Sequence, residues 1–135
     1  VNVAKELAVD NQAEVNLEQV YAWDPDMILI TNFTSAQPQD LYDNTVGSYD
    51  WSGVSAVKNQ QVYKMPLGMY RSYTPGVDTP VTLLWLAKTV YPDLFTDIDI
   101  VEKTKDYYKT VFGVELTEEQ AASIFAPVSD AAAGF

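Results

Sequence analysis

The chain has 135 residues, of which 47% are hydrophobic and 13% aromatic, and its formal net charge is −11 at pH 7. This length and apolar content predict one folded domain with a buried core, and the negative charge argues against nucleic acid as a partner because phosphates would be repelled. The sequence contains no Cys and no His, which excludes disulfides, thiolate metal sites and imidazole catalysis and argues against an enzyme.

The first predicted elements are a capped helix and a buried strand. Asn16 and Gln19 have the spacing of a capping box for a helix over residues 17–23. The apolar run MILIT, residues 27–31, has the length and composition of a strand buried on both faces, as in parallel sheets.

A polar loop over residues 32–38 leaves this strand. A second helix is predicted to begin at Ser35 or a neighbour and to end near Gly47. After a short compact segment, Lys58-Asn59-Gln60 predicts a turn into a second strand over residues 61–65.

The second half of the chain predicts three helices. The first begins with Thr79 as N-cap and Pro80 at the first helical position, and it ends at Tyr91-Pro92. The other two are predicted from capping-box pairs, Asp99 with Glu102 and Thr117 with Gln120. The fold class is therefore α/β with helices outnumbering strands. Two strands are too few for a self-sufficient sheet, which favours a missing N-terminal portion.

Four phrases, in this order, resemble the periplasmic-type substrate-binding proteins that serve ABC importers of ferric siderophores, haem and cobalamin. They are NLEQVYAWDPDMILI at 16–30, WSGVSAVKNQQVYKMP at 51–66, LLWLAKTVYPDLF at 83–95 and KDYYKTVFGVELTEEQAASIF at 105–125. The opening VNVA is similar to a further phrase of that family. The resemblance implies that residues 1–126 form the C-terminal lobe of a two-lobed binding protein, followed by a flexible tail over residues 127–135.

Such a lobe has a three-layer architecture with a small, mostly parallel central sheet flanked by helices. The family implies an extracytoplasmic protein, periplasmic or lipid-anchored, that is a solute-binding component and not an enzyme. Its expected partners are a metal chelate (ferric siderophore, haem or cobalamin), the N-terminal lobe of the same protein and an ABC permease. No cofactor and no resident metal are expected.

The loop between the second strand and the helix at Thr79 carries the main candidates for ligand binding. Arg71 has a forked donor for carboxylates or for the oxygens of a ferric chelate, and Tyr70 and Tyr73 offer flat rings with hydroxyls. Met69 is a candidate haem ligand. Alternatively, the tyrosines only pack the loop, Arg71 is a solvated charge and Met69 is an ordinary loop residue.

Asn32 and Thr34 follow the first strand and are expected at the same edge of the sheet as this loop, if the two strands are parallel neighbours. The alternative is ordinary capping of a loop. Asp40, Asp43 and Asp78 are candidates for an acidic edge that docks on the permease, although acidic residues are abundant throughout the chain.

The rival hypothesis from another class is an enzyme. Metal-tetrapyrrole chelatases and nitrogenase-type proteins have lobes of similar fold, so the fold alone does not exclude chemistry. A third alternative is an acidic module that binds only protein, which leaves the Tyr/Arg loop unexplained.

Overall fold

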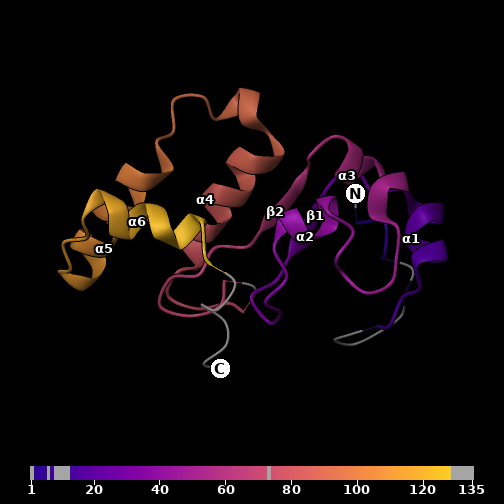
Figure 1. Ribbon diagram of the computed structural model, residues 1–135. Helices are drawn as coiled ribbons and strands as arrows, with labels where there is room; N and C mark the ends of the chain where they lie inside the picture. Colours follow the sequence, from indigo (N-terminus) through magenta and orange to yellow (C-terminus); the bar gives the residue numbers. More distant parts are fainter. Residues whose placement is uncertain (1, 6, 8–12, 73, 129–135) are drawn as a thin grey trace. The chain divides into compact units, whose positions relative to one another are not determined.

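The computed structural model describes residues 2–5, 7, 13–72 and 74–128 (Figure 1). The chain divides into two compact units, the first formed by Val1–Ile30 with Ala36–Tyr63 and the second by Thr31–Ser35 with Lys64–Phe135. In the described part of the chain, strands β1 (Ile28–Ile30) and β2 (Val62–Lys64) pair as one parallel, two-stranded sheet. Helices outnumber strands, so the predicted α/β class is confirmed.

The first helix, α1 (Leu17–Trp23), has the predicted bounds and the predicted cap. The side chain of Asn16 accepts a hydrogen bond from the amide of Gln19, and the side chain of Gln19 accepts one from the amide of Asn16. These two bonds satisfy backbone donors that no helical carbonyl can reach.

Helix α2 (Pro38–Tyr42) is much shorter than predicted. It begins after Gln37, whose amide donates to Asp40, and Pro38 takes the first helical position. It ends early because Asn44 adopts a left-handed conformation with φ 55°, while the amide of Thr45 turns back to the carbonyl of Asp40. The prediction of a helix as far as Gly47 was therefore wrong.

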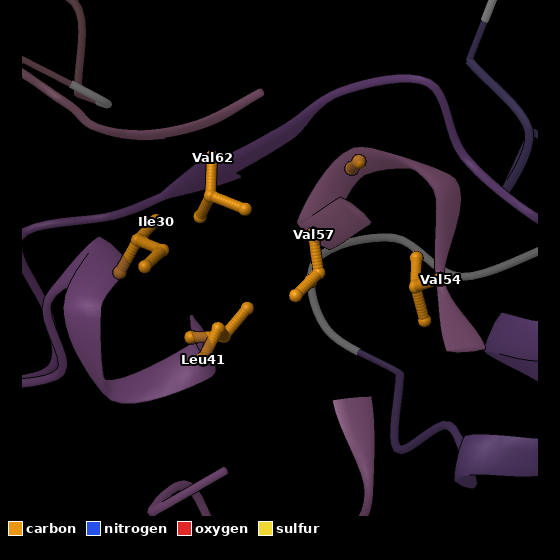
Figure 2. Close-up of a cluster of buried hydrophobic side chains, with 6 residues drawn as sticks. Ile30, Leu41, Val54, Val57 and Val62 are labelled. Atoms are coloured by element: carbon orange, nitrogen blue, oxygen red, sulfur yellow. The ribbon is translucent and has the colours of Figure 1, made fainter. Parts of the chain in front are cut away.

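The core of the first unit is a cluster of aliphatic side chains. Val54 lies between the 3-10 helix η1 (Trp51–Gly53) and helix α3 (Ser55–Lys58), α3 itself supplies an alanine and a valine, and β1, α2 and β2 supply the rest. Figure 2 shows these side chains gathered between the backbone segments that carry them. Its buried members are Ile30, Leu41, Val54, Ala56, Val57 and Val62.

Strand β1 is buried on one face only. Ile30 lies in the core, but Leu29, which points to the opposite face, is 36% exposed. The described residues therefore do not cover both faces, and the expectation of a strand buried on both sides does not hold at Leu29.

The second unit contains α4 (Thr79–Val90), the 3-10 helix η2 (Pro92–Leu94), α5 (Ile100–Phe112) and α6 (Glu118–Phe125). Helix α5 packs against α4 and against α6, and Figure 1 shows α5 and α6 side by side in orange and yellow. No helix among the described residues combines the length and the apolar character of a membrane span.

The caps of the second unit differ from prediction in two details. Thr79 is the first residue of α4 and not its N-cap, which is Asp78, and the Thr79 hydroxyl accepts a hydrogen bond from the amide of Gly76 instead. Asp99 caps α5 as predicted, but Glu102 does not complete the box because its carboxylate binds Lys105 at 2.6 Å.

The predicted cap of α6 is confirmed, since Thr117 and Gln120 form a complete capping box. Most of the predicted C-terminal tail, residues 129–135, lies outside the described residues.

Candidate functional site

Two loops meet beyond the carboxyl ends of the strands. Asn32, two residues after β1, is completely buried and donates from Nδ2 to the carbonyl of Met65, the residue that follows β2, at 2.7 Å. This bond joins the segments that leave the two strands. Parallel neighbouring strands explain why residues 33 positions apart in the sequence come together at one edge.

Lys64 strengthens the same junction. Its ammonium group donates to the carbonyls of Thr31 at 3.0 Å and Thr34 at 2.6 Å, and the residue is buried. The backbone of Thr34 is therefore held in place, while the residue itself is exposed. The sequence reasoning missed Lys64. The available signal was its alternation with Val62 in a short strand, which places both side chains on one face.

Arg71 is not the solvated charge that the alternative interpretation supposed. It is buried, and its guanidinium lies over the ring of Phe33 with 4.4 Å from the Arg71 Cζ to the ring centroid. The backbone around Arg71 forms an antiparallel bridge with Leu67, so both the side chain and the main chain have a defined position. Phe33 was also missed, although a large aromatic residue within a polar loop was a visible signal.

Met69 and Tyr70 carry the exposed surface of this region. They are 48% and 45% exposed, and they stand two residues and one residue before Arg71, respectively. Phe33 is 51% exposed and lies against the buried guanidinium of Arg71, so an exposed aromatic ring and a buried cation are neighbours here. Tyr73, the third candidate of the loop, lies outside the described residues.

Asp78 anchors the backbone of this loop. Its Oδ2 accepts hydrogen bonds from the amides of Met69 at 2.7 Å and Tyr70 at 3.3 Å, and its Oδ1 accepts one from the hydroxyl of Tyr108. Burial and the nearby Asp78 raise the pKa of Tyr108, so that its hydroxyl remains a donor at neutral pH.

The three aspartates expected at a docking edge differ in exposure. Asp78 is only 4% exposed and its carboxylate is used inside the second unit, so the structure does not place it on an acidic surface. Asp43 is exposed and accepts from Gln39, whereas Asp40 is half-buried and serves as the capping partner of Gln37. Only Asp43 therefore keeps the exposure that docking requires.

The region combines a fixed positive charge with exposed flat groups, an arrangement that suits stacking on a ring and charge-assisted hydrogen bonds to anionic oxygens. Among the described residues, no group of three or more His, Cys, Asp or Glu side chains is placed to hold a metal ion.

The chain shares sequence with one curated protein and fold with several solved ones. It is 31% identical over 116 residues to the molybdate-binding protein MolA of Haemophilus influenzae, an alignment that covers 81% of this chain and 30% of the relative. No family model matches the chain.

Three solved structures superpose on most of the chain. A periplasmic solute-binding protein from Veillonella parvula has a TM-score of 0.84 and 33% identity, and the match covers 91% of this chain and 37% of that protein. CeuE of Helicobacter pylori, solved as a Ni-His complex, has a TM-score of 0.66 and 28% identity, with 85% and 36% covered. An ABC transporter solute-binding protein from Sulfurospirillum deleyianum has a TM-score of 0.66 and 27% identity, with 88% and 36% covered. The chain thus spans about a third of the length of the proteins it matches.

Proposed function

We propose that this chain is the C-terminal lobe of a periplasmic solute-binding protein of an ABC transporter, a proposal supported by its similarity in sequence and in fold to such proteins. The lobe captures a solute together with a second, N-terminal lobe of the same protein and delivers it to the membrane permease. The protein therefore acts outside the cytoplasm, in the periplasm or on a lipid anchor, and is a binding protein with no catalytic step.

The observation that carries this proposal is the junction of the loops that follow β1 and β2. Asn32 binds the backbone of Met65 and Arg71 lies on Phe33, so residues from both loops form one surface. In open α/β sheets, ligands bind beyond the carboxyl ends of the strands, which is where this surface lies.

The chemistry of the surface supports a ligand that is flat or ring-bearing and carries negative oxygens. Arg71 supplies the positive charge, and Met69 and Tyr70 supply exposed apolar area next to it. We therefore propose a ferric siderophore or a related iron or corrinoid complex as the cargo, with Thr34 and Tyr73 as further contacts. Asn32 is completely buried, so its proposed part is to hold the two loops together and not to touch the ligand.

Two of the similar proteins suggest alternatives to the proposed cargo. One relative is named for molybdate and one was solved with nickel and histidine. Molybdate offers anionic oxygens without a ring, so it would use the charge of Arg71 and leave the exposed Tyr70 and Met69 without a role.

Titration of the full-length gene product tests the proposal. The panel comprises ferric tris-catecholate, a ferric trihydroxamate, haem, cobalamin, nickel–histidine and molybdate. Binding of the coloured complexes is measured by absorbance, and binding of molybdate by calorimetry. We expect an iron or corrinoid complex to bind most tightly. Binding of molybdate or nickel–histidine alone would contradict the proposed cargo and leave the solute-binding role intact.

Two variants test the site. Arg71→Ala and Tyr70→Ala should each weaken binding by about tenfold or more, which corresponds to the loss of one charge-assisted or stacking contact of about 1.4 kcal/mol. Lys103→Ala, which removes an exposed cation from α5, is the matched control and should leave the affinity unchanged. Equal affinities in the wild type and the three variants would show that the ligand does not bind at these loops.

A further inference from the structure

The buried carboxylate of Asp78 stands between the exposed segment Met69-Tyr70 and helix α5. Both of its oxygens are used, Oδ2 by the amides of Met69 and Tyr70 and Oδ1 by the hydroxyl of Tyr108. A buried carboxylate that accepts several hydrogen bonds is a strong anchor, because bonds to a charged acceptor are stronger than bonds between neutral groups.

Helix α5 holds the same region with two neighbouring tyrosines. Tyr107 donates to the carbonyl of Val77 at 2.6 Å, and Tyr108 donates to Asp78. Tyr108 is itself fixed, since it is buried and its ring lies edge-on to Phe112 at 5.6 Å between centroids. The segment Val77-Asp78 is therefore tied to a packed helix at two adjacent residues.

Gly68 lets the segment approach Asp78 closely. A Cβ atom added at Gly68 would lie 2.7 Å from Oδ2 of Asp78 and 2.8 Å from its Cγ, which is closer than real Cβ contacts allow. Any other residue at position 68 would therefore displace either the carboxylate or the backbone that precedes Met69 and Tyr70. The close packing of the Asp78 carboxylate against the backbone therefore requires glycine at position 68.

We propose that Asp78 and Tyr108 are positioning residues that fix the backbone of Met69 and Tyr70 in the conformation that binds ligand. This inference rests on the proposed function, because it assigns to the pair the task of presenting that surface. Neither residue touches the ligand. They act through the amides of Met69 and Tyr70, whose side chains are exposed while their backbone is anchored.

Amide hydrogen exchange of the full-length protein without ligand tests the anchoring directly. In Asp78→Asn the side chain keeps its shape but loses its negative charge and one of its two acceptor atoms. The amides of Met69 and Tyr70 would then bond to a neutral oxygen, which is a weaker acceptor, and the hydroxyl of Tyr108 would lose its place as a donor to a carboxylate. We expect the protection of the Met69 and Tyr70 amides to fall by about tenfold or more, and Tyr108→Phe to lower it in the same direction.

Binding of ferric tris-catecholate tests the functional part. Its Kd should rise by about tenfold or more in Asp78→Asn, measured well below the unfolding temperature. Thr104→Ala is the control, since Thr104 is buried in the same helix as Tyr108 and its hydroxyl donates to the carbonyl of Ile100 in that helix at 2.7 Å. It should lower the melting temperature without changing the exchange of residues 69 and 70 or the Kd.

Gly68→Ala disturbs the same contact by placing a Cβ against the carboxylate of Asp78, and it leaves the charge of Asp78 intact. It should reproduce the loss of protection and of affinity. Unchanged protection in both Asp78→Asn and Gly68→Ala would overturn the proposal, as would lost protection with an unchanged Kd. A wild-type protein that binds nothing in the panel would contradict the proposed function instead, and the exchange of Met69 and Tyr70 would still decide whether Asp78 holds them.

Discussion

Asp24, the residue that ends α1, accepts both hydrogens that Ser55 offers at the start of α3. The backbone amide of Ser55 donates to Oδ1 at 2.8 Å and its hydroxyl donates to Oδ2 at 2.9 Å. Asp24 thus caps a helix 31 residues away, and it does so from a left-handed conformation with φ 40°. Two elements of the first unit are joined by one exposed carboxylate.

The Asp24 contact predicts a pH-dependent contribution to stability. The bonds from Ser55 lower the pKa of Asp24 below its usual 3.8. A carboxylate with a lowered folded-state pKa stabilises the fold above the unfolded pKa, and that contribution disappears as the pH falls through the folded pKa. In Ser55→Ala the Asp24 pKa should rise toward 3.8, as measured by NMR titration of the carboxyl carbon.

The matched control for Ser55→Ala is Ser52→Ala, because Ser52 bonds to Asp50 instead. It should leave the pKa of Asp24 unchanged. The stability difference between wild type and Ser55→Ala should be present at neutral pH and should shrink below about pH 4. A difference that is constant from neutral pH to pH 2 would contradict this assignment.

Asn32→Ala should destabilise the protein by about 1–3 kcal/mol, since it removes the bond to Met65 and leaves a carbonyl without its partner in a buried place. Urea unfolding followed by circular dichroism measures this change. Asn59→Ala, at an exposed position, is the control and should stay within about 0.5 kcal/mol of wild type. Equal losses in the two variants would show that the buried bond has no special weight.

Val54→Ala should lower the free energy of unfolding by about 1–3 kcal/mol, because two methyl groups leave a fully buried position in the core of the first unit (Figure 2). Val111→Ala removes the same atoms from an exposed position in α5, where alanine also favours the helix, and should change little. Tryptophan fluorescence during urea unfolding compares the two.

Gly113→Ala should destabilise the protein by roughly 1 kcal/mol through the backbone alone. Gly113 ends α5 with φ 67°, and an added Cβ would meet no atom within 4 Å. Gly76→Ala is the matched control, since its nearest contact would be an ordinary 3.8 Å to Thr74. If both substitutions lower the melting temperature equally, the left-handed conformation is not the cause.

Helix boundaries set by short-range bonds were predictable from sequence. Asn16 with Gln19 and Thr117 with Gln120 each act over three residues, so the pattern contains both partners of the bond. Helix α2 was mispredicted because its end depends on the left-handed Asn44, which no apolar period signals. Local chemistry is visible in a sequence, whereas a single reversed dihedral angle is not.

The candidate surface was predictable only in outline. The order of strand, loop and helix placed Asn32 and Arg71 at one edge, but the partners that fix them lie far along the chain. Arg71 lies on Phe33, 38 positions away, and Asp78 binds Tyr108, 30 positions away. For this reason Asp78 was expected on the surface, where isolated carboxylates usually lie, and Lys64 was not considered.

The hydrogen bonds made by Lys64 and Asn32 have a consequence for the kinetics and selectivity of ligand binding. These bonds hold both loops in one arrangement without any contribution from a ligand, so few torsional states remain to be lost on association. Affinity at such a place comes from rigidity as much as from the number of touching atoms. We therefore expect complementary guests to leave slowly, and guests of the wrong shape to be rejected without any rearrangement of the backbone.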